Sequence, residues 1–579
     1  MAAEISTGLP TFKIFSDGSE INRSYGVTAI SVTKQVNRIS NARLVLLDGN
    51  VAQQNFELSA GAEFVPGNEI EIKVGYNNTE ESIFKGIIIK HSIKSKMDKA
   101  SLLILDIKDA CVKLTVGKKS NYFKEITDSS IIEQIAGDYQ GIDKDVQSTS
   151  LEHKEMAQYY CSDWDFILSR AEANGLLVFT EAGKISVKAP EISSDVKLPL
   201  TYGQNIIEFE AGMDARDQYA ALKTKAWDYS TQELKEAEGE DPGLEETGNI
   251  SGSGLSDVIG LEELPFQHPG KLAEGELQAW ADSRLLRSRL AKIRGRVRIH
   301  GNASVNPGDT IELIGLGDRF NGKAFVSGVL HQVSANTNWF TDIEFGLSPE
   351  WLAERFDNIE DKPAAGLLPS IHGLHTGVVT KIHEDPDGED RIKVRLPLIN
   401  AEDEGIWARV ACLDAGDKRG VFFRPELEDE VIVGFINDDP RYPVVLGMLN
   451  SSAKPAPLTA EEENNEKGFI TRSEMKLLFN DDKKIITLET PGGNKLVLDD
   501  DDGSVLIEDK NGNKIKMSDE GITIESAKDI NLKATGNVKV EGKDISASAQ
   551  SNFVAEGNSS AEFKTSGKAT IKGSMVGIN

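Results

Sequence analysis

The chain has 579 residues, of which 64 are Lys or Arg and 93 are Asp or Glu, so its formal net charge is -29 at pH 7. Nucleic acid and anionic membrane surfaces repel so acidic a protein, and this composition argues against both as partners. The length leaves room for three or four domains, each large enough to bury its own core.

The amino terminus and the apolar runs predict a protein made and folded in the cytoplasm. Residues 1–10 lack a basic region followed by an apolar run, so we expect no signal peptide. No apolar run approaches the roughly 18 residues of a membrane-spanning helix, and we expect no stable membrane insertion. The cysteines Cys111, Cys161 and Cys412 are an odd, sparse set with neither a disulfide framework nor the spacing of a metal knuckle.

Residues 1–370 alternate strand-like runs with a few helices. Apolar segments such as 42–47, 69–74 and 101–106 are typical of β-strands. A helix is predicted to begin after Ser162, which is an N-cap residue with an acid three positions later, and to end at Asn174 and Gly175.

Two further segments complete the first region. A longer helix is predicted over 271–293, where apolar residues recur at helical spacing. The acidic stretch 233–258 contains several Gly and Ser residues, and we interpret it as a solvated loop.

Residues 371–450 predict a small all-β barrel. Strand-like segments at 376–382, 391–396, 406–410 and 430–435 are separated by turns rich in Asp, Pro and Gly. Short strands with such turns suit an oligonucleotide/oligosaccharide-binding (OB) barrel. A linker over 451–468, rich in Ser, Pro, Ala and Glu, follows this segment.

Residues 469–579 are predicted to form a needle of short repeated strands. Each unit is an apolar-polar-apolar core followed by turn-forming residues, and Gly503, Gly512 and Gly521 fall at even spacing. Such short units bury about two apolar side chains per strand, so identical chains must wind together to form a core. We expect the apolar residues to meet on the shared axis, namely Ile522, Ile524, Ile530, Leu532, Val538 and Val540.

This order of segments resembles the VgrG family, the spike proteins of type VI secretion and related contractile injection systems, similar to the hub and needle of phage tails. The most specific segments are 406–410, 423–435 and 443–450, which look like the family's barrel signature. Residues 164–175 resemble the characteristic helix of the hub, and 468–473 resemble the lead-in to the spike.

The resemblance implies a mainly β fold: a hub of two related β-barrel modules with a few helices, an OB barrel, and an intertwined trimeric β-helix (β-prism) needle. It implies a homotrimer whose hub seats on a hexameric inner tube protein and on baseplate proteins. It also implies that a small tip protein of the PAAR-repeat type covers the far end, at Met575, Val576, Ile578 and Asn579. Because no lysozyme or toxin domain fits in the sequence, we expect effector cargo to travel as separate proteins.

Few residues suggest chemistry, and we expect no catalytic residue, no cofactor and no metal. His372 and His375 lie three residues apart, with His383 further along the chain, but no well-placed third metal ligand shares an element with the pair. The start of a helix beside Cys161 could lower its pKa, but no His partner is evident. The acidic run Asp499 to Asp502 is interpreted as a turn between needle strands rather than as a calcium loop.

A structural spike is therefore favoured over an envelope-degrading or carbohydrate-binding protein that would use the barrel as a ligand platform. Such a platform needs exposed aromatic side chains, whereas we assign most barrel aromatics to its core, namely Trp407, Phe422, Phe423, Phe435 and Tyr442. The sequence fits a type VI system anchored in the producing cell and a free extracellular particle equally well.

Overall fold

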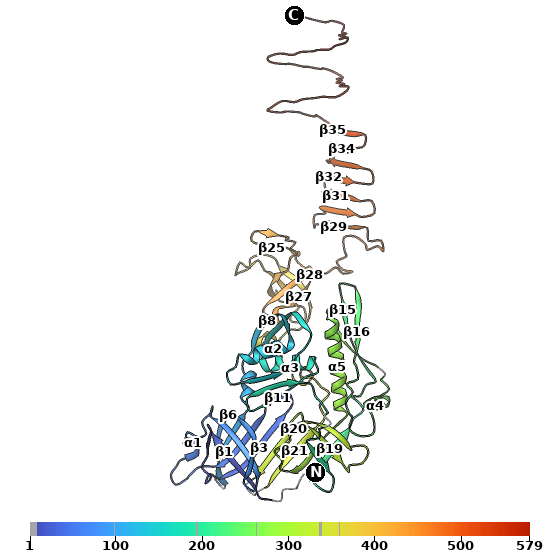
Figure 1. Ribbon diagram of the computed structural model, residues 1–579. Coiled ribbons are helices and arrows are strands. Elements are labelled where there is room, and N and C mark those ends of the chain that lie inside the picture. The colour runs from blue at the N-terminus through green and yellow to red at the C-terminus, as the bar shows by residue number, and fades with distance from the viewer. Residues whose placement is uncertain are drawn as a thin grey trace. The chain divides into compact units, whose positions relative to one another are not determined.

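In the computed structural model the chain is mainly β, with 40% of its residues in strands and 12% in helices, which confirms the predicted fold class (Figure 1). The structure describes residues 8–97, 99–192, 195–261, 263–334, 338–357 and 359–578. One folded unit holds the chain up to Gly373 together with Phe435–Pro443, and the second holds Leu374–Gly434 and the chain from Val444 onward. The four-part division at 370, 450 and 468 stays a prediction.

A sheet of 13 strands dominates the first unit. Its main path runs in the order β14, β18, β21, β20, β3, β4, β7, β6, β5, β1 and β2, while β19 pairs with β13 and with β20. The strands are β1 (Pro10–Ser16), β2 (Ser19–Glu20), β3 (Val27–Gln35), β4 (Asn41–Leu47), β5 (Glu69–Tyr76), β6 (Thr79–Lys96), β7 (Lys99–Lys108), β13 (Leu198–Thr201), β14 (Glu208–Met213), β18 (Ile293–His300), β19 (Thr310–Ile314), β20 (Gly322–Ser334) and β21 (Trp339–Phe345).

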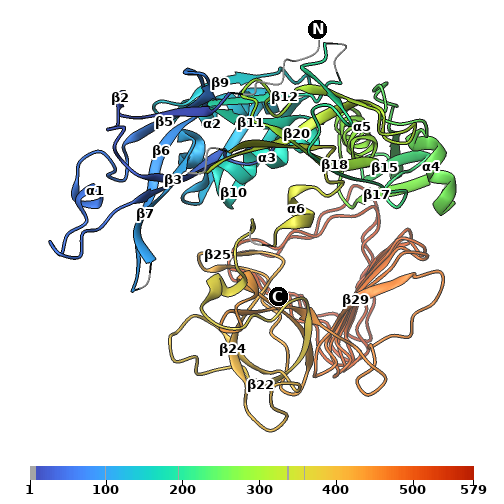
Figure 2. The ribbon, with the colours of Figure 1, turned by 90° about the horizontal axis from the view of Figure 1, so that it is seen from below.

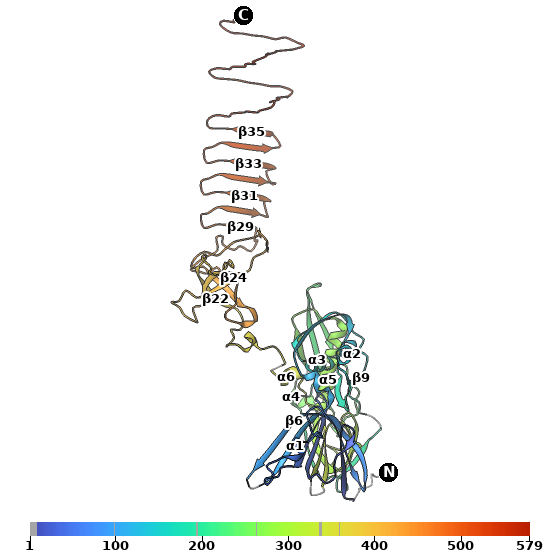
Figure 3. The same ribbon diagram turned by 90° about the vertical axis from the view of Figure 1, so that its left-hand side faces the viewer.

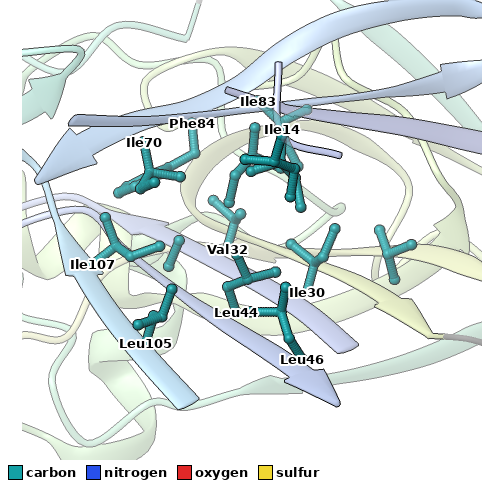
Figure 4. Packing of buried hydrophobic residues seen from close by; sticks show 14 of the residues in the cluster. Ile14, Ile30, Val32, Leu44, Leu46, Ile70, Ile83, Phe84, Leu105 and Ile107 are labelled. Atoms are coloured by element: carbon teal, nitrogen blue, oxygen red, sulfur yellow. The ribbon is translucent and has the colours of Figure 1, made fainter. Parts of the chain in front are cut away.

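The alternation of side chains along these strands sets the hydrophobic core. In β4, Ala42, Leu44 and Leu46 are buried while the residues between them face outward, as the two-residue period of a strand requires. They pack with Ile14, Val32, Leu105 and other apolar side chains of β1 to β7 (Figure 4). The strands predicted over 42–47, 69–74 and 101–106 are thereby confirmed as β4, β5 and β7.

A second core lies under the later strands of the same sheet. Val297, Val329 and Ile343 are buried there, together with further apolar residues of β13 to β21. One long sheet therefore carries two separate apolar cores, one formed mainly by residues up to 107 together with Val333 and Trp339, and the other by residues after 197.

Smaller elements complete the first unit. The remaining strands form three small sheets: β8 (Lys119–Thr127) with β10 (Glu152–Cys161); β9 (Asp143–Val146), β11 (Leu177–Glu181) and β12 (Lys184–Lys188); and β15 (Ala221–Asp228), β16 (Glu233–Glu238) and β17 (Glu263–His268). The helices are α1 (Glu57–Ala60), α2 (Asp128–Gly137), α3 (Asp163–Ala173), α4 (Gly252–Ile259), α5 (Glu274–Ala291) and α6 (Leu352–Arg355), with 3-10 turns at Ala110–Thr115, Pro363–Gly366 and Ile436–Asp438.

Both helices predicted from the sequence are confirmed. The Ser162 side chain accepts a hydrogen bond from the Asp165 amide at the start of α3, as an N-cap should, and Asn174 caps the other end. The second predicted helix is α5, which packs beside β15 and the rest of its small sheet (Figure 2).

The predicted loop over 233–258 is wrong at both ends. Strand β16 occupies its first residues and pairs antiparallel with β15, and helix α4 occupies its last ones. The acidic side chains of β16 suit a strand because lysines of β15 neutralise them, as in the Lys225–Glu236 pair at 2.9 Å. The charge pattern of this segment is typical of a loop, but pairing with β15 makes it a strand.

A buried histidine makes the first unit sensitive to acid. Burial, with the charge of Lys34 as a smaller cause, lowers the pKa of His331 to about 3, and its Nδ1 lies 3.0 Å from Thr341 Oγ1. Below the unfolded pKa of about 6.5, only the unfolded chain takes up the proton, so stability falls as pH drops towards 3.

We expect the free energy of unfolding to fall by roughly 2–3 kcal/mol between pH 7 and pH 4.5 through this one residue. Urea unfolding followed by tryptophan fluorescence would measure the loss, and His331→Gln should flatten that part of the pH dependence. Substituting the exposed His268 by Gln serves as the matched control. A pH dependence unchanged by His331→Gln would contradict the assignment.

The predicted barrel is confirmed as a closed barrel of β22 (His375–Lys381), β23 (Ile392–Arg395), β24 (Ile406–Val410), β28 (Pro443–Met448) and β27 (Glu430–Phe435). Small β-branched side chains fill it, namely Val379, Val394, Val431, Val433 and Val445, with Ile392 and Ala408. A two-stranded hairpin of β25 (Ala415–Gly416) and β26 (Arg419–Gly420) extends from one loop of the barrel.

The predicted needle begins as a seven-stranded antiparallel meander in sequence order. Figure 3 shows its strands stacked one above the next, with the chain beyond β35 continuing as an open zigzag. In the described residues 526–578, one chain forms no further strand. The strands are β29 (Glu466–Ile470), β30 (Lys476–Asn480), β31 (Ile485–Glu489), β32 (Lys495–Asp499), β33 (Ser504–Glu508), β34 (Lys514–Ser518) and β35 (Gly521–Glu525).

Candidate functional site

The most unusual surface of the chain is one face of the needle meander, which is apolar along its whole height. The register of the ladder sets it: Phe479 lies opposite Ile486, and Leu498 lies opposite Val505. Cross-strand partners share a face of the sheet, so these side chains form two continuous columns. We call this surface the apolar face; from β30 to β35 it comprises Leu477, Phe479, Ile486, Leu488, Leu496, Leu498, Val505, Ile507, Ile515, Met517, Ile522 and Ile524.

No part of one chain covers the apolar face among the described residues. Leu488, Ile507 and Ile522 are 50%, 47% and 69% exposed, although they belong to a regular sheet. Fully burying such a side chain stabilises a protein by about 1.5–3 kcal/mol, so a large gain is still available to whatever covers this face. Apolar surface of this extent marks an interaction site.

The opposite face, which we call the polar face, carries a repeating ion pair beside the apolar residues Leu478, Ile485, Val497 and Leu506. Lys476–Glu489, Lys495–Glu508 and Lys514–Glu525 lie 3.7, 3.4 and 2.8 Å apart, one pair for every two strands. The two residues of each pair lie directly opposite each other on neighbouring strands. Because the pairs are exposed, each stabilises by well under about 1 kcal/mol, and they serve mainly to fix the register.

Asparagine side chains join successive turns at one edge of the meander. The Asn494 Oδ1 accepts a hydrogen bond from the Lys510 amide at 3.3 Å, one turn further on. In the next turn the Asn513 Oδ1 accepts from the Ser526 hydroxyl at 2.6 Å and from the Ala527 amide at 3.1 Å. The stacked hairpins are thus tied along the needle, which keeps the apolar face continuous.

The six residues predicted to meet on an axis divide into three groups. Ile522 and Ile524 lie on the apolar face, opposite Met517 and Ile515. Ile530 lines an open groove of about 590 Å³ together with Ile524 and other apolar residues of this face. Leu532, Val538 and Val540 are exposed beyond β35. Their meeting on an axis stays a prediction.

Reasoning from the sequence missed the upstream part of the apolar face, from Leu477 to Met517. The signal was available, because the segments 476–480, 485–489 and 495–499 each alternate apolar residues at two-residue spacing. What the sequence did not reveal is the register that joins these short alternations into columns.

The apolar residues at the far end are also exposed. Met575 and Ile578 are 90% and 87% exposed, and Val576 is exposed as well. Asn579, predicted with them as a docking residue, lies outside the described residues. Their role in binding a tip protein stays a prediction.

The groups considered for chemistry are occupied by local interactions. His372 lies 2.9 Å from Asp438 and 2.8 Å from Ser370, while His383 lies 3.8 Å from Glu384. Burial, with the charges of Asp165 and Asp163, raises the pKa of Cys161, so the expected effect of the helix start is overridden. Within the described ranges, no group of three or more His, Cys, Asp or Glu is arranged to hold a metal ion.

The turn at the acidic run is confirmed: the Asp502 amide donates to the Asp499 carboxylate at 2.9 Å, between β32 and β33. In the same described part of the chain, every helix is too short or too polar to cross a bilayer.

The assignment of the barrel aromatics to the core is wrong. Phe422 is 79% exposed, and Phe423 and Tyr442 are exposed as well, while Trp407 and Phe435 are half-buried. The interior has room only for the small side chains named above, which excludes the large rings. Phe423 instead stacks on Phe469 of the first needle strand, with ring centroids 5.3 Å apart and planes at 8°.

Three family models match the chain. The model for the Alg8 N-terminal domain matches residues 6–335. The type VI secretion system/phage-baseplate injector OB domain matches 375–449, which includes the closed barrel. The phage baseplate V C-terminal trimerisation domain matches 485–547, which includes most of the apolar face and all six residues predicted for the axis.

Two curated relatives and a solved structure are similar to parts of this chain. The type VI secretion system spike proteins VgrG4b and VgrG5 of Pseudomonas aeruginosa are each 30% identical, over 136 and 112 residues, or 22% and 18% of this chain. The matches span about a sixth of the length of these relatives, 16% and 14%. A tail protein from Neisseria meningitidis is 14% identical with a TM-score of 0.43, covering 59% of this chain and 98% of its own.

Proposed function

We propose that this chain, which belongs to the family of the Alg8 N-terminal domain, forms the hub and needle of a contractile injection particle. It is a VgrG-type spike protein. Its task there is mechanical: it is driven through a target envelope when the sheath contracts. The observation that carries the proposal is the uncovered apolar face, which lies largely within the trimerisation-domain match.

Three copies are the arrangement that best covers the apolar face. Two sheets packed face to face would leave their strand edges open. Three sheets instead close a prism with every apolar face inside. The polar face with its Lys–Glu pairs then points to solvent. In this arrangement, the short segments beyond β35 pair with segments of the other two chains, which supply the partners that one chain lacks.

The hub of such a trimer matches a hexameric inner tube. Two apolar cores lie under one long sheet, which supports two related modules per chain. Three chains then present six similar modules to the six subunits of a tube ring. This symmetry requires positioning alone, and we propose a non-enzymatic role with a separate tip protein and separate effector cargo.

Imaging of assembled particles tests the proposal directly. With a gold-labelled affinity tag on this chain, negative-stain micrographs should show label at one end of the inner tube only. Purified trimers should also co-elute with rings of the inner tube protein. Label along the sheath, or trimers that never bind the rings, would contradict a position at the tip.

A second candidate is supported by the exposed aromatic residues of the barrel. Phe422 and Tyr442 expose aromatic rings of the kind that stack on sugars, so the barrel could hold an envelope polysaccharide. Co-sedimentation with peptidoglycan tests this candidate. Binding that is lost on Phe422→Ala with Tyr442→Ala, while gold label is absent from particles, would favour a carbohydrate-binding protein.

A further inference from the structure

A further cavity lies in the first unit, well away in sequence from the needle. It is an open groove of about 760 Å³ between the long sheet and helices α3 and α6. Its walls come from the turn after β3, from the end of β7, and from β18 and β21. The proposed mechanical role does not use this groove.

The groove is cationic, although the chain as a whole carries a net charge of -29. Six basic residues line it, namely Arg38, Lys108, Arg287, Arg294, Arg296 and Arg355, against the three acids Asp165, Glu172 and Glu344. Among the described residues, Arg38, Lys108 and Arg294 form no ion pair. These three are therefore the cations that an incoming anion would meet first.

The acids of the groove are held by local hydrogen bonds and are half as many as its basic residues. Glu172 lies 3.0 Å from Arg287 and accepts from the Leu352 amide at 2.8 Å. Glu344 accepts from the Gln35 amide group at 2.6 Å. Asp165 accepts from the Ser162 hydroxyl at 2.6 Å, as part of the cap of α3. The uncompensated charge of the groove is thus positive.

Apolar side chains lie among the cations and complete the lining. Phe356 is 42% exposed and Ile359 is half-buried, while Leu168, Phe345 and Leu352 form the buried floor beneath them. An inorganic anion or a phosphate group would gain nothing from these side chains. A peptide with both acidic and apolar side chains uses both features of the groove.

We propose that this groove binds an acidic, amphipathic peptide segment of a partner protein. Carboxylates of the segment pair with Arg38, Lys108 and Arg294, and its apolar side chains pack on Phe356 and Ile359. A nucleic acid fits less well, because a long polyanion is repelled by the remaining surface, whereas a short acidic segment carries few charges. The proposal stands independently of the trimeric needle.

A fluorescein-labelled peptide of about ten residues, with Leu at every third position and Glu elsewhere, serves as the probe. Fluorescence anisotropy with the full-length protein should show salt-dependent binding. The groove variant Arg38→Glu, Lys108→Glu, Arg294→Glu should weaken binding by about tenfold or more. The matched control is Lys94→Glu, Lys96→Glu, Lys99→Glu, which changes the net charge equally on exposed positions of the β6–β7 hairpin and should bind as the wild type does.

Several results would overturn the proposal. Equal binding by the groove and control variants, or equal binding of the peptide with Lys in place of Glu, would remove the charge recognition. Tighter, groove-dependent binding of single-stranded DNA would favour nucleic acid, and a changed oligomeric mass of the groove variant would make the groove an interface between copies. If the triple Glu variant fails to fold, substitution of the same three residues by Gln supplies the same comparison.

Discussion

Replacing Leu496 and Ile507 by Asp is expected to dissociate most of the trimer. The two residues lie opposite each other in the middle of the apolar face, on β32 and β33. In three copies, the double substitution places six carboxylates inside a closed prism, where each unpaired charge costs several kcal/mol. Light scattering at micromolar concentration should give three times 63.1 kDa for the wild type and a mean mass shifted strongly towards 63.1 kDa for the variant.

The control places the same two charges on the opposite face. Thr487 and Thr523 belong to β31 and β35, and the register puts them on the polar face of the meander. Thr487→Asp with Thr523→Asp should therefore leave the mass unchanged. Deleting 485–579 should weaken association in the same sense as the charged apolar face, with hub contacts retaining some of it. A wild-type protein that is already monomeric, or a trimer that survives Leu496→Asp with Ile507→Asp, would be incompatible with the prism.

Elements with a strong local signal could be predicted from the sequence alone. Helix α3 has a cap at each end, and the structure places the Ser162 and Asn174 caps where the sequence indicated. The barrel strands were recognised because turn residues separate short apolar runs, and four of the five were predicted within about two residues. In these elements the interactions that fix the boundary lie within a few residues of it.

Features that depend on distant partners could not be predicted. Strand β16 is acidic enough to be solvated by itself, and it forms because lysines of β15 lie across from it. The barrel aromatics were wrongly assigned to the core. The sequence shows that they are apolar, but it does not show that Val394, Val433 and similar residues already fill the interior. The groove in the hub joins residues from 33 to 359, which no sequence window brings together.

The needle lies between these two cases. Alternation of apolar residues predicted its short strands, and the small core of each unit predicted that other chains must complete it. The columns of the apolar face depend on hairpin register, which places Leu488 opposite Leu477 and Ile524 opposite Ile515. A one-residue slip would move every apolar side chain to the polar face, so the cross-strand ion pairs are positioned to prevent it.

Charging the far end of the needle is the second change expected to have a large effect. Met575, Val576 and Ile578 are exposed in one chain, and three copies bring them together as an apolar plateau with open strand ends. We propose that a small tip protein covers this plateau. Val576→Asp with Ile578→Asp puts six carboxylates into that contact in the trimer, and each one buried without a partner costs several kcal/mol. A co-expressed tip protein should then fail to co-purify, while the trimer mass stays unchanged because the apolar face upstream is intact.

The matched control changes the net charge by the same amount at nearby polar positions. Lys568 and Lys572 are exposed in the last repeats, and replacing both by Gln removes two positive charges per chain. This control should retain the tip protein at wild-type levels, which separates loss of the apolar contact from a general increase in negative charge. If the trimer forms and the tip protein still co-purifies fully with Val576→Asp and Ile578→Asp in place, the plateau is not the docking surface, and these residues only close the end of the prism.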